Sequence, residues 1–170
     1  GKSLGIKTSK SDTTPPNFEE GVFHTIEEAK LDISKANFFA HGTTLVINAI
    51  TERKGVTVGF ITTKGFRDSL EIARGDRPDF FNLRYLKPKP FVPRYLRAEV
   101  AGRMNFKGQE MIALDLAALP KIIVNFKQNN VEAIAICLLH SYSNQTHELK
   151  LRDEVKKLWP EVEVVISSDI

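Results

Sequence analysis

Hydrophobic residues near the start of the chain recur with the spacing of an amphipathic helix. Apolar side chains at positions 18, 22, 26, 29 and 33 lie three or four residues apart, which predicts a helix over residues 18–35. Residues 1–17 are rich in Ser, Thr, Lys, Pro and Gly and have no such period, so we expect a flexible leader there. The folded domain is therefore predicted to span residues 18–170.

Strand and helix patterns alternate in the next part of the chain. The apolar residues 38–40 predict a strand that stops at Gly42, and helical spacing returns over residues 45–55. The β-branched residues 56–61 predict a second strand, and residues 66–73 predict another short helix. This alternation indicates repeated βα units.

A proline-rich stretch and a hairpin pattern interrupt the alternation. Four prolines between residues 75 and 97 exclude a long helix and favour an extended excursion. Alternating apolar positions in residues 98–100 and 109–114, with a polar turn at 105–108, predict a β-hairpin.

The last third has the clearest pattern. Residues 116–126 and 151–158 have one apolar helical face each, residues 133–139 form a continuous apolar strand, and residues 163–166 begin a final strand. A continuous apolar strand between helices is typical of a parallel sheet covered on both faces. The predicted fold class is therefore α/β, with a mostly parallel or mixed sheet and crossover helices.

Composition and charge narrow the class of protein. The 170 residues suit one domain, and 42% hydrophobic with 26% charged residues is ordinary for a globular protein. A net charge of +3 gives a nearly balanced surface, so we expect no nucleic-acid partner. The single cysteine, Cys137, cannot form an internal disulfide, and no apolar run approaches the roughly 20 residues that span a bilayer. We expect a cytoplasmic protein without a membrane segment.

The first candidate site is the turn formed by His41, Gly42, Thr43 and Thr44. A turn between a strand and a helix can present backbone N–H groups to an anion, and the hydroxyls add donors or a route to Mg²⁺ through water. Alternatively, one threonine simply caps the helix. Asn48 lies four residues after Thr44 on the same helix face, where it either extends the polar stripe or satisfies nearby backbone.

Two further polar clusters follow predicted strands. Arg67 and Asp68 form the first cluster, and His140 and Ser141 form the second. Ligands of open α/β sheets bind outside the carboxyl ends of strands, which makes both clusters candidate binding sites. The alternatives are a surface ion pair and a helix cap. The spacing of His140 and His147 matches no metal motif, so we expect no metal site formed by the chain.

Five motifs occur in order: HGTT at 41–44 with Asn48, ERKG at 52–55, TTKGFRD at 62–68, PFVPR at 90–94, and LHSY at 139–142 with Asn144, His147 and Glu148. Together they make residues 14–170 resemble the amino-terminal region of the hydantoinase A / 5-oxoprolinase family. The resemblance implies part of an actin-like, ribonuclease H-like ATPase fold with a β-hairpin insertion.

The resemblance also implies an activity. Members of the family are ATP-dependent enzymes that open cyclic amides such as hydantoins or 5-oxoproline, or are subunits of acetone and acetophenone carboxylases. Their shared step is activation of a poorly reactive carbonyl or carboxylate by phosphoryl transfer from ATP with Mg²⁺, which depends mainly on positioning and electrostatics. We therefore expect His41 and Asp68 to be catalytic. The expected nucleotide-binding or substrate-binding residues are Gly42, Thr43, Thr44, Asn48, Arg67, Arg94, His140 and Ser141.

The sequence departs from the family pattern in two places. No Gly-Gly-Thr phosphate turn precedes residue 14, and Gly102 stands where the family often has an acidic residue. We expect a chain truncated at both ends that does not hydrolyse ATP alone. Three functions stay open: part of a cyclic-amide hydrolase, a ketone carboxylase subunit, or a scaffold domain that binds a partner through residues 78–93. The resemblance implies a hydantoinase B-like partner subunit and an oligomeric full-length protein.

Overall fold

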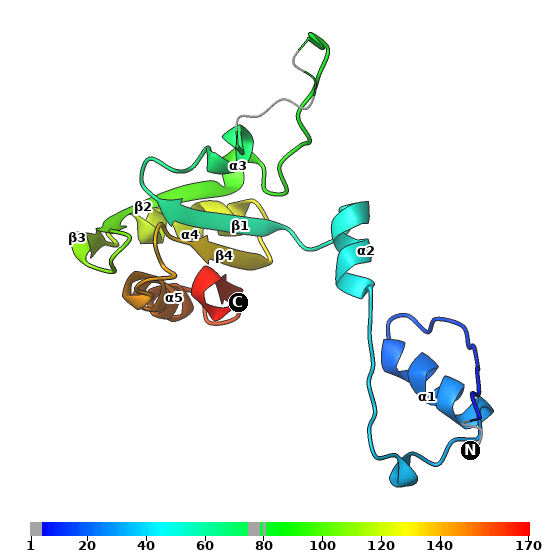
Figure 1. The fold of residues 1–170 in the computed structure, drawn as a ribbon. Helices are drawn as coiled ribbons and strands as arrows, with labels where there is room; N and C mark the ends of the chain where they lie inside the picture. The colour runs from blue at the N-terminus through cyan, green and yellow to red at the C-terminus, as the bar shows by residue number, and fades with distance from the viewer. Residues whose placement is uncertain (1–4, 75–78, 80) are drawn as a thin grey trace. The chain divides into compact units, whose positions relative to one another are not determined.

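The computed structural model describes residues 5–74, 79 and 81–170 and divides the chain into two compact units, Gly1–Thr44 and Leu45–Ile170 (Figure 1). In the first unit, α1 (Phe18–Glu28) is followed by the short 3₁₀ helix η1 (Ile33–Lys35). The hydroxyls of two residues before α1 bind its backbone: Gly21 N donates to Thr14 Oγ1 at 2.9 Å, and Ser11 Oγ donates to Gly21 O at 2.7 Å. That residues 1–17 form a flexible leader stays a prediction.

Two predictions for the first unit are wrong. The continuous helix over residues 18–35 ends at Glu28, because Lys30 adopts φ 50°, a left-handed conformation that a helix cannot continue through. The predicted strand at residues 38–40 has no regular structure. A strand depends on a hydrogen-bonded neighbour, and every strand pairing in the described part of the chain lies at residue 58 or later.

The second unit is built on a five-stranded mixed sheet, which confirms the α/β prediction. Its strand order is β3-β2-β1-β4-β5, and only the β2–β3 hairpin is antiparallel. The strands are β1 (Val58–Thr63), β2 (Arg97–Met104), β3 (Glu110–Asp115), β4 (Ala133–Cys137) and β5 (Glu163–Ile166). The helices are α2 (Leu45–Glu52), α3 (Ser69–Ile72), α4 (Leu119–Gln128) and α5 (Thr146–Leu158), with the short 3₁₀ helices η2 (Arg94–Leu96) and η3 (Ser167–Asp169).

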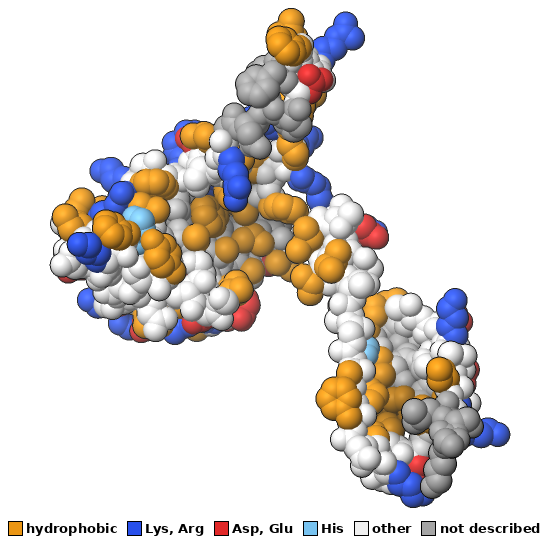
Figure 2. Space-filling model, viewed as in Figure 1, with side chains coloured by type: hydrophobic (Ala, Val, Ile, Leu, Met, Phe, Trp, Pro, Cys, Tyr) orange, Lys and Arg blue, Asp and Glu red, His pale blue; other side chains and the backbone are white. Residues whose placement is uncertain are grey.

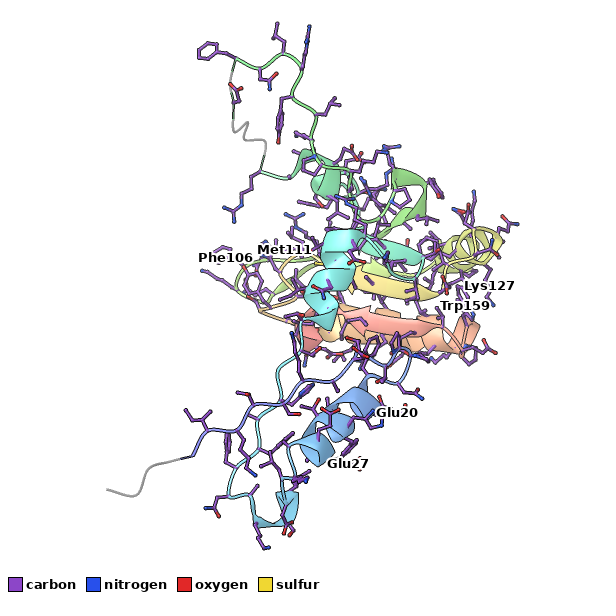
Figure 3. The ribbon with its side chains drawn as sticks, turned by 90° about the vertical axis from the view of Figure 1, so that its right-hand side faces the viewer. Glu20, Glu27, Phe106, Met111, Lys127 and Trp159 are labelled. Carbon is purple, nitrogen blue, oxygen red and sulfur yellow. The ribbon has the colours of Figure 1, made fainter. Side chains whose placement is uncertain are left out.

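Helices α4 and α5 cover one face of this sheet. Their buried side chains pack on the inward residues of the strands and form one core; its largest hydrophobic members are Phe126, Ile61, Leu96, Leu119, Ile134, Ile136, Leu151 and Ile166. Gly59 allows α4 to approach β1 closely, since a Cβ at this position would lie 2.6 Å from the Phe126 ring. Lys127 of α4 lies 5.0 Å from the ring centre of Trp159, which follows α5 (Figure 3). This cation–π contact ties together the ends of the two helices.

The opposite face of the sheet is largely open in the part that the structure describes. The register places Phe60 and Thr62 of β1 beside Ala135 and Cys137 of β4 on this face, and Cys137 is exposed. The direction of the connections explains why the two faces differ. Connections between parallel strands are right-handed, and the chain moves from β1 to β2 in the opposite direction across the sheet from β4 to β5. The two connections therefore lie on opposite faces. The helix of the β1-to-β2 connection, α3, has only four residues. The prediction of a sheet covered on both faces is therefore wrong for the described residues.

Hydrophobic side chains gather on this open face between α3 and the carboxyl terminus (Figure 2). We name it the open face, defined by Val58, Phe60, Thr62, Ala135 and Cys137. The thiol of Cys137 is exposed on this face. Among the helices of the described chain, none has the length and apolar character needed to cross a membrane.

Candidate functional site

A cavity of about 1080 Å³ opens at the carboxyl ends of β1 and β4, on the open face. Its walls come from both strands, from α3, from the loop after β4 and from η3. Figure 2 shows this side of the second unit. The lining residues that matter most below are Phe60, Leu70, Cys137, Leu139, His140 and Ser141. The structure thus brings one predicted cluster, His140 and Ser141, to the edge of the sheet where ligands of α/β proteins bind.

Two threonines join the ends of the central strands. The Thr62 hydroxyl donates to the carbonyl of Cys137 at 2.9 Å, and Leu139 N donates to the Thr63 hydroxyl at 3.0 Å. Both threonines are buried. Their hydroxyls satisfy backbone groups that the ladder no longer pairs where β4 ends, so they hold the cavity floor in place.

Glu148, near the start of α5, organises the rest of this edge. Its side chain is fully buried, yet it accepts hydrogen bonds from Leu138 N at 2.8 Å, from the Ser167 hydroxyl at 2.7 Å and from Ser168 N at 3.0 Å. One carboxylate therefore ties together the ends of β4 and β5. A negative charge in the first turn of a helix is also favoured by the helix dipole.

A chain of hydroxyls leads from Glu148 to the cavity. Ser141 Oγ lies 3.0 Å from Ser167 Oγ, and the Ser167 hydroxyl donates its single hydrogen to Glu148. Ser141 must therefore be the donor in the first pair. Because its hydrogen faces Ser167, the lone pairs of the Ser141 oxygen are left as acceptors beside the cavity.

His140 turns the backbone at the cavity rim. Its φ of 62° lies in the left-handed region, and its Nδ1 lies 3.0 Å from the hydroxyl of Tyr142. The two rings meet edge to face with centres 5.7 Å apart. This contact fixes the orientation of the imidazole next to Ser141.

The second predicted cluster forms an ion-pair network beside α3. Arg94 binds Asp68 through two hydrogen bonds of 2.8 and 3.0 Å. The hydrogen bond from Arg94 lowers the pKa of Asp68, and the same bond raises the pKa of Arg94. Arg67 donates its backbone N–H to Glu99 at 3.2 Å, while its buried Nε has no partner among the described atoms. That Asp68 is catalytic stays a prediction; its contacts are those of a paired carboxylate.

Arg97 belongs to the same network, although no motif in the sequence singles it out. Its side chain is 1% exposed; Nε donates to Val92 O at 2.8 Å and one terminal nitrogen donates to Glu71 at 2.9 Å. It lies 3.8 Å from Asp68 as well. The feature that could have indicated its burial is its position at the start of β2, directly after the 3₁₀ helix η2.

Gly102 lies at an irregularity of the hairpin. The β2–β3 register shifts between Ala101 and Arg103, and Gly102 adopts φ 145°. A Cβ there would lie 3.1 Å from the Leu114 backbone and 3.3 Å from Nδ1 of His147. The buried His147 pairs with Glu110 at 2.6 Å. The departure at Gly102 therefore suits a bulge packed against α5.

The other predicted residues lie outside the cavity walls. The turn residues His41, Gly42, Thr43 and Thr44 end the first unit, and Asn48 lies on α2 of the second unit. Their roles stay predictions. Within residues 5–74, 79 and 81–170, no three His, Cys, Asp or Glu side chains gather in a way that would hold a metal ion.

Comparisons with known proteins agree on one family. A family model described as hydantoinase/oxoprolinase N-terminal region matches residues 2–159. An uncharacterized protein of Methanocaldococcus jannaschii is 37% identical over 164 residues, covering 95% of this chain and 24% of that protein. The caprolactamase subunit alpha of Pseudomonas jessenii is 34% identical over 140 residues, covering 81% of this chain and 20% of that protein.

Solved structures show the same likeness. The nucleotide-free structure of acetone carboxylase, described as ATP-dependent, superposes with a TM-score of 0.80 at 25% identity, over 95% of this chain and 26% of that one. The ATP-dependent caprolactamase from Pseudomonas jessenii superposes with a TM-score of 0.76 at 29% identity, over 98% of this chain and 25% of that one. The chain thus spans about a quarter of the length of these relatives.

Proposed function

Because the chain belongs to the hydantoinase/oxoprolinase family and matches its N-terminal region, we propose that it forms part of an ATP-dependent enzyme that hydrolyses cyclic amides. The observation that carries the proposal is the cavity at the carboxyl edge, where apolar side chains such as Phe60 and Leu139 lie beside polar groups such as the Ser141 hydroxyl. A cyclic amide has an apolar ring and one polar N–H and C=O pair, which suits such a lining. In the superposed structures, the 29% identity to caprolactamase also exceeds the 25% identity to acetone carboxylase.

The phosphates of the nucleotide are proposed to be bound by residues other than those that line this cavity. No Lys or Arg is among the described residues that line it, whereas phosphate groups are bound by cations and backbone N–H groups. Gly42, Thr43, Thr44 and Asn48 are the proposed nucleotide-side donors, with Mg²⁺ reached through water. When bound, ATP supplies the phosphoryl group that makes the amide carbonyl reactive.

The side chains of Arg67 and Arg94 are proposed to face the anionic groups of the reaction. Arg67 has a buried Nε without a partner among the described atoms, which makes it the candidate donor to a phosphate or carboxylate oxygen. Asp68 is proposed to hold Arg94 in position through their two hydrogen bonds. His41 is the proposed catalytic residue of the turn. We also propose a cytoplasmic enzyme.

A ketone carboxylase subunit is the second candidate, because the TM-score to acetone carboxylase is 0.80 against 0.76 for caprolactamase. In either case we propose a partner subunit of the hydantoinase B type, as expected for a relative of a subunit alpha. The proposed contact is the excursion at residues 78–93, of which 78 and 80 lie outside the described residues. Phe81 and Leu83, each 94% exposed, support it.

The test is ATP turnover by the full-length protein with its partner subunit. Cyclic amides are expected to stimulate ATP hydrolysis and ring opening without bicarbonate. Stimulation by ketones that requires bicarbonate would instead establish the carboxylase. Replacing Thr43 and Thr44 together by Ala is expected to weaken nucleotide affinity at least tenfold, as loss of about two hydrogen bonds to a charged ligand implies. Thr51→Ala on α2, whose hydroxyl donates to Ile47 O, is the matched control.

A further inference from the structure

We propose that the cavity at the carboxyl edge is the site of the ring itself and that it selects cyclic amides without a charged substituent. This inference rests on the proposed function and adds the class of substrate and the residues that choose it. The first observation is the charge of the residues that line the cavity. The described lining residues include no Lys, Arg, Asp or Glu, although the ion-pair network of Asp68 and Arg94 lies next to α3.

A lining without Lys or Arg discriminates between substrates by desolvation. A carboxylate that enters such a cavity loses its water and finds no Lys or Arg side chain among the described lining residues in return, which is unfavourable. 5-Oxoproline and 2-pyrrolidinone differ only by a carboxylate on the same five-membered lactam ring. The neutral ring keeps all its hydrophobic contacts with Phe60, Leu70 and Leu139 and avoids that cost.

The hydroxyl chain specifies the amide. Glu148 takes the hydrogen of Ser167, and Ser167 takes the hydrogen of Ser141, so the Ser141 oxygen faces the cavity as an acceptor. An amide N–H is a donor of matching polarity, whereas a ketone has only an acceptor. The same residues therefore favour a lactam over a ketone.

Cys137 provides a direct readout of occupancy. Its thiol is exposed and lines the cavity, and it is the single cysteine of these 170 residues. A bound ring is expected to slow its reaction with a thiol reagent. Mass spectrometry of the peptide that contains Cys137 measures this in the full-length protein, whatever other cysteines that protein has.

A gain of charge tests the selectivity. Leu70 lines the cavity and is 41% exposed, so Leu70→Lys introduces an ammonium group at its wall. Leu158 of α5 has the same exposure of 41% and is absent from the lining, so Leu158→Lys is the matched control. The ratio of kcat/KM for 5-oxoproline to that for 2-pyrrolidinone is expected to rise about two- to fivefold in Leu70→Lys, as a partly exposed ion pair provides. The control is expected to leave the ratio unchanged.

The outcomes separate this inference from the proposed function. Protection of Cys137 by 2-pyrrolidinone but not by 5-oxoproline, together with the shift in Leu70→Lys alone, supports the inference. If the enzyme hydrolyses cyclic amides but Leu70→Lys behaves as Leu158→Lys and Cys137 reacts at an unchanged rate, the cavity is not the ring site and the proposed function stands. If no cyclic amide is hydrolysed and Cys137 is not protected, both are overturned. Protection of Cys137 without hydrolysis supports the neutral site and refutes the proposed reaction.

Discussion

Replacing Glu148 by Gln is expected to loosen the carboxyl edge of the sheet, because a carboxamide cannot copy the contacts of a carboxylate. Glu148 accepts from Leu138 N and Ser167 Oγ at one oxygen and from Ser168 N at the other. In either orientation of the amide, its NH₂ group faces at least one backbone N–H. That donor becomes buried without an acceptor.

The magnitude follows from the bonds lost. A hydrogen bond to a charged group contributes about 1.5–3 kcal/mol, and a buried unsatisfied donor costs about 1–3 kcal/mol. With one bond lost and the others weakened, Glu148→Gln is expected to cost about 2–4 kcal/mol in the free energy of local opening. This corresponds to roughly 30- to 900-fold faster amide exchange at the affected sites.

The assay is hydrogen exchange of the full-length protein, read by mass spectrometry on peptides that contain Leu138 or Ser168. Glu154→Gln on the same helix is the control, because Glu154 forms a largely exposed pair with Lys157. Peptides from α1 are expected to exchange at wild-type rates in both variants. Equal exchange around Leu138 and Ser168 in the Glu148 and Glu154 variants would refute the claim that Glu148 ties β4 to β5.

Two further predictions concern packing and pH. Gly59→Ala is expected to lower the free energy of unfolding by about 1–3 kcal/mol, since its Cβ would lie 2.6 Å from the Phe126 ring. Gly55→Ala is the control, because a Cβ at position 55 would meet no atom within 4 Å. The measurement is the melting temperature of the two variants. Arg94 lowers the pKa of Asp68, so their pair stabilises the protein above the ordinary aspartate pKa of about 3.9 and less so as the pH falls through the lowered value. The melting temperature of Arg94→Met is therefore expected to lie below that of the wild type at pH 6 and to approach it as the pH falls below the ordinary aspartate pKa. A constant difference across this range would contradict the assignment.

The elements that sequence reasoning predicted correctly are those whose pattern is local. The hairpin of β2 and β3, the strands β4 and β5, and the helices α4 and α5 each have a period or an apolar run that is sufficient by itself. Boundaries shifted by a few residues, as at α4, which begins at Leu119 rather than at 116. Two of the predictions that failed, the strand at residues 38–40 and the covering of both sheet faces by the described residues, depend on which segments pair or pack at a distance.

The candidate site shows the same limit for charged residues. From the sequence alone, Arg97 and Glu148 would be assigned to the surface, because no neighbouring residue in the chain indicates that they are buried. Their partners lie as far as 26 residues away for Arg97 and Glu71, and 20 for Glu148 and Ser168. Burial of a charge depends on such partners. His140 and Ser141 were predicted, since a strand end followed by polar residues is a local pattern.

Charge and neutrality are separated across the carboxyl edge, so the charge of the ring can be tested apart from the rigidity of the edge. The fully buried carboxylate of Glu148 accepts hydrogen bonds from Leu138, Ser167 and Ser168, so its charge is satisfied by residues that themselves line the cavity. Arg94 and Arg97 lie in the network with Asp68 and Glu71. A substitution at Glu148 should therefore change the rigidity of the edge and, through Ser167 and Ser141, the preference for an amide over a ketone. A new charge at Leu70 should change the choice between a charged and a neutral ring and leave the edge as rigid as in the wild type. If Leu70→Lys accelerated amide exchange around Leu138 and Ser168 as Glu148→Gln does, the edge would be one coupled site, and the division between a neutral cavity and a charged network would have no functional meaning.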